Sequence, residues 1–139
     1  MELKEQLEGV TWYSPIGSSM EFKMDGTTGI MSGVYHTAPG KMIAPLIGRF
    51  NPDGPGAFGW TVSWPKSLKY PTTSETSWGA YIENINGIPT IVSKWIITEQ
   101  LEGNLYYSTV NGCERYTPNK PDEKTIEANK HERTPHPLD

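Results

Sequence analysis

The sequence predicts an all-β protein, an eight-stranded antiparallel up-and-down β-barrel. Segments that favour strands follow one another at roughly the 8 to 12 residue spacing of antiparallel barrels and sandwiches. The 14 glycines and 12 prolines are enough to separate many short strands by tight turns. Closure removes exposed strand edges, which favours a barrel for eight sequential strands joined by short loops. A sandwich is the alternative that the spacing alone leaves open.

The expected strands alternate apolar and polar residues. In the second of them, Met20, Phe22 and Met24 are separated by polar side chains, which is the pattern of a strand with one buried face. No segment between residues 10 and 116 has the spacing of an amphipathic helix. In chain order, the expected strands are residues 10–13, 18–24, 30–35, 44–50, 58–64, 76–85, 90–98 and 106–116.

Turn signals separate these strands. Asp25 and Gly26 lead into the third strand, and the turn-rich stretch NPDGPG at 51–56 precedes the fifth. Asn86 and Gly87 are a strong signal for a two-residue hairpin, because both residues tolerate a positive φ. The sixth and seventh strands are therefore expected to form a hairpin.

The chain divides into an N-terminal extension (1–8), a barrel domain (9–118) and a charged C-terminal tail (119–139). A length of 139 residues suits one domain with one core. Residues 1–8 are charged and lack the apolar core of a signal peptide, so we expect either an intracellular chain or one whose leader has been removed. Residues 122–131 have the start signals of a short helix, but a solvated tail is the favoured interpretation.

The charge and hydropathy patterns exclude two classes of partner. The net charge is −4 without a basic stripe, which argues against nucleic acid. No run of about 18 apolar residues is present to span a membrane. We expect a soluble protein whose compartment the sequence leaves open, since no Asn-x-Ser/Thr sequon indicates secretion.

Residues that commonly carry chemistry are few. Cys113 is the single cysteine, and a plain thiol is favoured over a disulfide across a dimer axis. His131 and His136 lack carboxylates at a spacing typical of a metal site. His36 is the only histidine of the barrel region, and no nucleophile is paired with it. The sequence therefore predicts a protein that is not an enzyme and has neither metal nor cofactor.

Three tryptophans stand at the inward-facing ends of three successive expected strands. They are Trp64, Trp78 and Trp95, and each is close to hydroxyl side chains. A single tryptophan of this kind would be interpreted as core packing. Three together, each burying on the order of 150–250 Å², can desolvate a small ring between them. Polar groups aimed into an aromatic box predict a small-molecule pocket.

The stretches around these residues resemble the avidin and streptavidin family of biotin-binding proteins. The similarity runs from about Gly9 to Tyr116 and implies noncovalent, high-affinity capture of biotin in the open end of the barrel, with vitamin sequestration as the biological role. Members of the family are often secreted. The stretches are TWYSPIGSSM (11–20), GWTVSW (59–64), TSETSWGAY (73–81), SKWIIT (93–98) and YSTVNGCERY (107–116).

The resemblance also implies roles around the bicyclic urea of biotin. Ser18 and Tyr35 match donors to the ureido oxygen, and Ser14 stands where relatives usually carry an asparagine. Thr37 and Glu114 match acceptors of the two ureido N–H groups, although relatives have aspartate or asparagine at the second position. We interpret the smaller Ser14 and the larger Glu114 as a compensating pair of changes.

The remaining implied contacts concern the rings and the carboxylate of biotin. Thr76 matches a hydroxyl that faces the ring sulfur. Ser74 matches one that meets the valeryl carboxylate, together with backbone N–H groups of the loop that ends near Lys41. The apolar slot around the ring would be lined by Trp64, Trp78, Trp95 and Ile97.

The resemblance predicts a homo-oligomer. Tyr106 falls where tetrameric relatives lend a tryptophan to a neighbouring subunit, so its contact would be weaker or absent. A tetramer is usual in the family. A dimer is the alternative, because of the residues present at Tyr106 and, in the closing strand, at Asn111 and Cys113. The alternative function is a small barrel that serves as a protein-interaction or inhibitor module. Such a module has no need of the inward hydroxyls and tryptophans.

Overall fold

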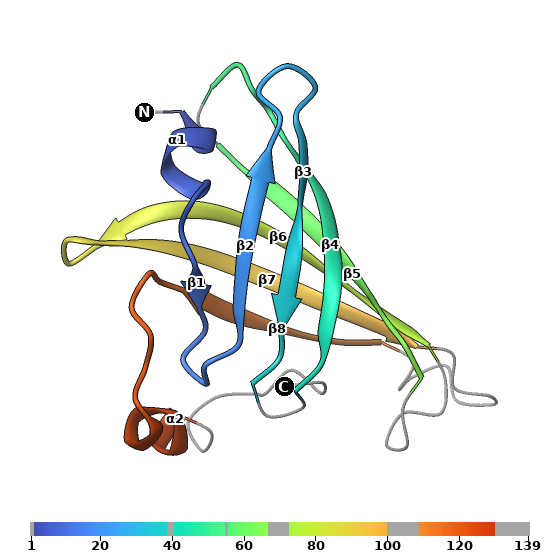
Figure 1. Ribbon diagram of the computed structural model, residues 1–139, viewed down its shortest axis with the longest axis vertical. Coiled ribbons are helices and arrows are strands. Elements are labelled where there is room, and N and C mark those ends of the chain that lie inside the picture. Colours follow the sequence, from blue (N-terminus) through green and yellow to red (C-terminus); the bar gives the residue numbers. More distant parts are fainter. Residues whose placement is uncertain (1, 39–40, 55, 67–72, 100–108, 130–139) are drawn as a thin grey trace.

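Eight strands form one antiparallel sheet in which each strand pairs with its neighbours in the sequence (Figure 1). The computed structural model describes residues 2–38, 41–54, 56–66, 73–99 and 109–129. The strands are β1 (Trp12–Tyr13), β2 (Ser19–Met24), β3 (Ile30–His36), β4 (Ile43–Phe50), β5 (Phe58–Trp64), β6 (Ser74–Ile85), β7 (Ile88–Glu99) and β8 (Thr109–Tyr116).

The sheet closes between its first and last strands. Tyr13 and Thr117 form an antiparallel bridge with two backbone hydrogen bonds, of 2.7 Å from Tyr13 N to Thr117 O and 2.9 Å in return. The closed sheet has no exposed edge at this point, which is the advantage that a barrel has over an open sheet. The predicted eight-stranded antiparallel barrel is confirmed.

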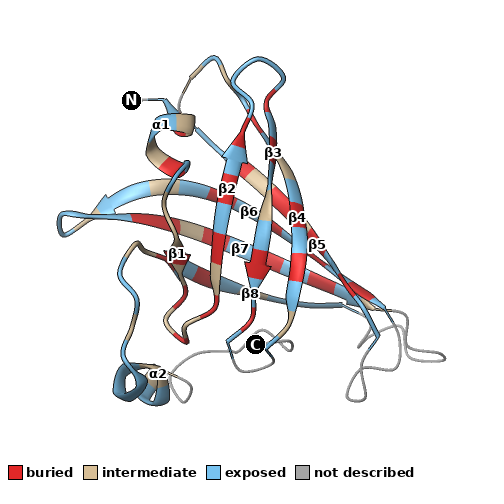
Figure 2. Ribbon diagram, in the orientation of Figure 1, coloured by how far each residue is buried: buried red, intermediate tan, exposed pale blue. Residues whose placement is uncertain are grey.

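Alternation of side chains determines which residues form the core. Along β6 and β7, buried and exposed residues alternate over most of each strand (Figure 2). This period of two follows from the pleat, which points successive side chains to opposite faces of the sheet. Asn86 and Gly87 both have positive φ, of 52° and 83°, and they join β6 to β7 in the predicted hairpin. The part of the eighth expected strand before residue 109 lies outside the described residues.

The N-terminal residues contribute to the core at one end of the barrel. Residues Leu3–Leu7 form helix α1, whose two leucines are 2% and 0% exposed. The indole Nε1 of Trp12 donates a 3.1 Å hydrogen bond to the carbonyl oxygen of Leu7, which joins the helix to β1. Figure 1 shows α1 beside the end of the barrel that carries the β2–β3 hairpin.

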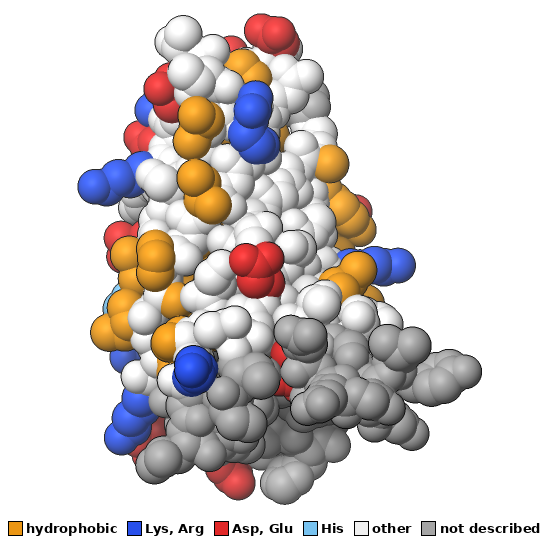
Figure 3. Space-filling view, turned by 90° about the vertical axis from the view of Figure 1, so that its right-hand side faces the viewer, with side chains coloured by type: hydrophobic (Ala, Val, Ile, Leu, Met, Phe, Trp, Pro, Cys, Tyr) orange, Lys and Arg blue, Asp and Glu red, His pale blue; other side chains and the backbone are white. Residues whose placement is uncertain are grey.

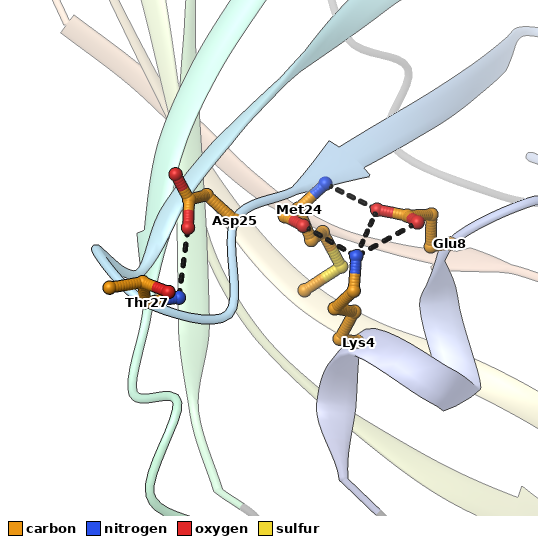
Figure 4. A network of polar contacts seen from close by, with 5 residues as sticks. All are labelled: Lys4, Glu8, Met24, Asp25 and Thr27. Atoms are coloured by element: carbon orange, nitrogen blue, oxygen red, sulfur yellow. Dashed lines mark hydrogen bonds and ion pairs between the residues drawn. The ribbon is translucent and has the colours of Figure 1, made fainter.

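Polar contacts fasten α1 to the end of β2 (Figure 4). The Lys4 ammonium contacts the Glu8 carboxylate at 3.1 Å and donates a 2.9 Å hydrogen bond to the carbonyl oxygen of Met24. Glu8 Oε2 accepts a 2.6 Å bond from the backbone N–H of Met24. This bond, with the Lys4 contact, lowers the pKa of the Glu8 carboxyl below its usual range.

The C-terminal tail contains a second helix, so the favoured prediction of a solvated tail is wrong for part of it. Residues Glu123–Asn129 form α2, as the short-helix alternative expected, and no residue of this helix is buried. The Asp122 side chain accepts a 2.7 Å bond from the backbone N–H of Thr125, which caps the helix. Asn129 Nδ2 donates a 2.9 Å bond to the carbonyl oxygen of Pro15. His131 and His136 lie outside the described residues.

A column of aromatic rings fills the centre of the barrel. Phe58 stacks on Trp60 with centroids 5.8 Å apart, Trp60 stacks on Trp78 at 5.4 Å, and Trp78 stacks on Tyr35 at 5.2 Å. Cross-strand pairing produces this column, because Trp60 of β5 lies directly opposite Trp78 of β6. The stacked rings form a rigid floor beneath the open end of the barrel.

The outer surface differs from this interior. On the face of the molecule shown in Figure 3, apolar side chains lie among polar and charged ones, and several of them lie together at the left of the view. Cys113 is a free, exposed cysteine on β8, opposite Lys94 of β7. Over the described ranges, no helix has the length and hydropathy needed to cross a membrane.

Candidate ligand-binding site

The predicted site residues gather at the end of the barrel opposite α1. The β1–β2 connection at 14–18 and the described residues of the β3–β4 connection, 37–38 and 41–42, both lie there (Figure 1). Because neighbouring strands are antiparallel, the last residues of β5 and β7 and the first residues of β6 and β8 belong to the same end. Residues far apart in the sequence therefore meet at this opening.

Ser14 and Ser18 define the β1–β2 connection, and both are buried. The backbone N–H of Ser14 donates to the carbonyl oxygen of Ser18 at 2.8 Å, and Ser14 Oγ accepts a 3.1 Å bond from Ser18 N. Gly17 has a φ of 88°, which the tight turn between the two serines requires. The Ser14 hydroxyl thus holds the loop that presents Ser18.

The β3–β4 connection is closed by Thr37. Its backbone N–H donates to the carbonyl oxygen of Met42 at 2.9 Å, and its Oγ1 accepts a 2.9 Å bond from Met42 N. Lys41 has a φ of 52°, and its side chain is exposed. Ser18 Oγ accepts a 3.2 Å bond from the backbone N–H of Ala38, so the two connections support each other.

Tyr35 is the last ring of the aromatic column and stands two residues before Thr37, where the β3–β4 connection begins. Its side chain is 1% exposed, and its ring stacks on Trp78 and meets the Trp64 ring edge-on at 5.8 Å. Its hydroxyl lies 2.9 Å from the hydroxyl of Tyr116 on β8. The ring has little rotational freedom in these surroundings, so the phenol oxygen has a defined position.

The tryptophan wall comes from the inner faces of β5, β6 and β7. Trp78 lies opposite Trp95, and Ile97 lies opposite Thr76 in the same pair of strands. Trp64 Nε1 donates a 2.8 Å bond to Thr76 Oγ1. All five side chains are buried. The three predicted tryptophans therefore share one interior surface with the predicted aliphatic and hydroxyl residues.

Ser74 lies at the mouth of the barrel, opposite Trp64 of β5 and Glu99 of β7. A pocket of about 860 Å³ lies at this rim, lined by the buried Trp64 and Ser74 and by exposed residues that include Ile43 and Thr98. Ser74 is the first residue of β6, and it places a buried hydroxyl at the mouth of the barrel.

Glu114 places a carboxyl group on the inner face of β8. The residue is buried, and its Oε1 accepts a 3.1 Å bond from the backbone N–H of Arg115. Its backbone carbonyl accepts a 2.9 Å bond from Ser93 Oγ on β7, which ties the two strands together at this residue. Tyr116 follows two residues later on the same inner face.

Two residues of β8 that sequence reasoning did not select also shape the site. Gly112 lies opposite Trp95, and a Cβ at Gly112 would stand 2.5 Å from Cζ2 of that indole. Tyr116 contributes the hydroxyl next to Tyr35. The sequence held a signal for both residues. Gly112 and Tyr116 stand two residues before and after Glu114, and residues two apart on a strand share a face of the sheet.

The structure brings the predicted residues together, with two exceptions. Lys41 belongs to the β3–β4 connection but exposes its side chain, and Tyr106 lies outside the described residues. Among the described residues, no group of three or more His, Cys, Asp or Glu side chains is placed to hold a metal ion. The rest form an interior of hydroxyls, indoles and one carboxyl group, which can bind a small heterocycle by hydrogen bonds and apolar contact.

This barrel and its interior define a class of ligand-binding protein, and comparison with known proteins identifies it. The model of the avidin family matches residues 1–118, so the chain belongs to the avidin family. The family expected from the sequence motifs is confirmed.

Solved structures show the same fold. Xenavidin superposes with a TM-score of 0.67 at 22% identity, over 84% of this chain and 98% of that one. The rhizavidin–biotin complex gives a TM-score of 0.63 at 22% identity, over 82% and 95% of the two chains. The complex of short afifavidin with biotin gives a TM-score of 0.61 at 26% identity, over 78% and 86%.

Proposed function

We propose that this protein binds biotin noncovalently in the open end of its barrel. The observation that carries the proposal is the set of buried hydroxyls of Ser18, Tyr35 and Thr37 beside a wall of buried tryptophans, in a chain of the avidin family. Rhizavidin and short afifavidin have been solved as biotin complexes. A dry aromatic slot with a few rigid polar groups is the usual design of a small-molecule site.

Ser18 and Tyr35 act as donors to the ureido oxygen in this proposal. Their bonds to Ala38 N and to Tyr116 support it, because each bond restrains a hydroxyl that would otherwise rotate. A donor that is already held in place loses little entropy when the ligand binds.

Thr37 and Glu114 accept the two ureido N–H groups. Thr37 Oγ1 already accepts one bond from Met42 N, and a hydroxyl oxygen has a second lone pair for the ligand. The Glu114 side chain is longer than the aspartate or asparagine of relatives. Ser14 is shorter than the asparagine of relatives, and we interpret these two departures as a compensating pair of changes.

The rings of biotin occupy the apolar slot lined by Trp64, Trp78, Trp95 and Ile97. Thr76 faces the ring sulfur, and its hydroxyl oxygen accepts the Trp64 N–H, which holds this oxygen in place at the slot. Ser74 at the mouth binds the valeryl carboxylate with backbone N–H groups of the loop near Lys41. The exposed Lys41 side chain suits a position at the rim.

Binding alone, without a reaction, is the activity in this proposal, and its biological consequence is sequestration of the vitamin. The protein acts as a homo-oligomer, a tetramer or a dimer, with Tyr106 as the contact to the neighbouring subunit. Exposed apolar residues on the outer faces of β4 and β7 support association. They are Ile43, Ile47 and Ile96.

Calorimetric titration with biotin, run beside size-exclusion chromatography, tests ligand and assembly together. A thermal melt with biotin gives an independent result, because a ligand at 1,000 times its dissociation constant adds about 4 kcal/mol to the apparent stability. A melting temperature that biotin leaves unchanged, with no heat of binding, would contradict the proposal. That outcome would favour the interaction-module alternative instead.

A further inference from the structure

Tyr116 carries a buried hydroxyl that the proposed ligand contacts do not use. It lies on the inner face of β8, two residues after Glu114, and its side chain is 1% exposed. Its oxygen is 2.9 Å from the hydroxyl of Tyr35, a residue 81 positions earlier in the chain. A buried phenol normally has a hydrogen-bond partner, and here that partner is a proposed ligand donor.

Ring contacts hold Tyr116 in place independently of its hydroxyl. Its ring meets Tyr35 edge-on with centroids 6.4 Å apart and meets Trp60 at 6.1 Å. Trp60 stacks on Trp78, and Trp78 stacks on Tyr35, so the four rings form a closed circuit of contacts. Removal of the phenol oxygen alone therefore leaves the ring positions supported by packing.

The proton count of the two hydroxyls determines the direction of their bond. A phenol has one proton to donate and lone pairs to accept with. If Tyr35 donates its proton to a ligand oxygen, it can only accept from Tyr116, and Tyr116 must be the donor of the pair. A hydrogen bond received by a hydroxyl polarises it and strengthens the bond that it donates.

We infer that Tyr116 is a positioning residue for ligand binding, which donates its proton to Tyr35 and thereby aims and strengthens the bond from Tyr35 to the ureido oxygen. This inference rests on the proposed function, since it needs Tyr35 to be a ligand donor. Tyr116 itself makes no contact with the ligand. It also couples the strand that carries Glu114 to the strand that carries Tyr35.

Four proteins test this inference, namely the wild type, Tyr116→Phe, Tyr35→Phe and the double variant. The measurement is the dissociation rate of labelled biotin with its equilibrium affinity. Because the Tyr35–Tyr116 bond already exists without ligand, Tyr116→Phe should weaken biotin binding by about three- to fivefold, part of the effect of one net hydrogen bond. In the Tyr35→Phe background, the same substitution should change the affinity less than twofold, or about 0.4 kcal/mol. The reason is that the Tyr35 hydroxyl, through which Tyr116 acts on the ligand, is absent from this variant.

The choice of ligand separates a positioning role from a structural one. Thiobiotin has sulfur in place of the ureido oxygen and accepts hydrogen bonds weakly, whereas desthiobiotin keeps the ureido group and lacks the ring sulfur. Tyr116→Phe should weaken desthiobiotin as much as biotin and should affect thiobiotin less. A general distortion of the barrel would weaken all three equally.

The outcomes distinguish this inference from the proposed function. A wild-type protein that fails to bind biotin removes both. Binding by the wild type, with an equal loss from Tyr116→Phe in the presence and absence of the Tyr35 hydroxyl, overturns the positioning role and leaves the function intact. An unchanged affinity of Tyr116→Phe in the wild-type background overturns it as well.

Discussion

The indole nitrogen of Trp64 donates a 2.8 Å hydrogen bond to the hydroxyl of Thr76 between β5 and β6. Both side chains are buried, so this bond satisfies an N–H group that has left water. It also fixes the plane of the indole at the edge of the proposed ligand slot. One threonine thus orients an indole of the aromatic wall.

Replacement of Thr76 by valine should destabilise the folded protein. Valine keeps the shape of threonine but leaves the Trp64 N–H buried without its acceptor, at a cost of about 1–3 kcal/mol. Denaturant unfolding measures this loss as a change in the free energy of unfolding. Thr98→Val, the same substitution at an exposed position of β7, should cost much less, and equal losses in the two variants would contradict the role of this bond.

Replacement of Gly112 by alanine should displace Trp95. The added Cβ would lie 2.5 Å from the indole Cζ2 atom, closer than such contacts allow, so the ring or the strand must move. Overpacking of this kind costs about 1–3 kcal/mol. We expect lower stability and weaker biotin binding in thermal melts with and without ligand.

Gly79→Ala is the matched control for Gly112→Ala. Gly79 also lies in a central strand, but a Cβ there meets nothing within 4 Å. This variant should retain both stability and affinity. If the two alanine variants have the same stability and biotin affinity, the close approach of Gly112 to Trp95 does not explain the effect of Gly112→Ala.

The contact between Glu8 and Met24 should make stability depend on pH in the acid range. The bond from Met24 N lowers the pKa of the Glu8 carboxyl in the folded state. A carboxyl group whose pKa is lowered on folding stabilises the fold above its unfolded pKa, about 4.3, and loses this contribution as the pH falls through the folded value. Glu8→Gln should therefore be less stable than the wild type at neutral pH, with a difference that shrinks on acidification.

Unfolding at a series of pH values measures this difference. Glu5→Gln removes one charge from α1, the helix that precedes Glu8, and leaves the Glu8–Met24 contact in place, so the stability that this contact contributes should be retained. A gap between Glu8→Gln and the wild type that stays constant from neutral to acid pH would argue against the assignment.

Replacement of Ser18 by alanine should weaken biotin binding. The proposed donor to the ureido oxygen is lost, which typically costs about 1–3 kcal/mol, or roughly five- to 150-fold in affinity. Titration calorimetry with competition measures the change. Ser19→Ala alters the neighbouring residue, whose side chain points to the opposite face of β2, and should bind as the wild type does. If the free energy of biotin binding falls by only a few tenths of a kcal/mol, the ureido oxygen of biotin does not bind at Ser18.

The compensating pair predicts a further result. Glu114→Asp alone should weaken biotin binding, because the shorter side chain no longer reaches a ligand placed for glutamate. The double variant Ser14→Asn with Glu114→Asp should recover affinity, since an asparagine oxygen can replace Ser14 Oγ as acceptor of the Ser18 N–H. Unchanged or tighter binding by Glu114→Asp would count against compensation.

Local patterns were sufficient to predict the barrel and its three inward tryptophans, whereas the resemblance to the avidin family supplied the other residues of the candidate site. Strand positions follow from alternation, and the β6–β7 hairpin follows from the positive φ that Asn86 and Gly87 tolerate. Trp64, Trp78 and Trp95 were found because neighbouring strands pair in sequence order, which keeps inward residues of successive strands together. These features depend on a few adjacent residues or on adjacent strands.

Other features depend on closure of the barrel, which no local pattern encodes. Burial of Leu3 and Leu7 requires an uncovered end of the core, and that end exists only once β2 and the aromatic column are in place. The Tyr35–Tyr116 bond requires β3 and β8 to face each other across the interior. The contact of Gly112 with Trp95 requires the specific register of β7 and β8. Long-range packing therefore determines these contacts. The alternating pattern fixes which residues of a strand face inward, but several strand registers and placements of α1 would satisfy it equally well.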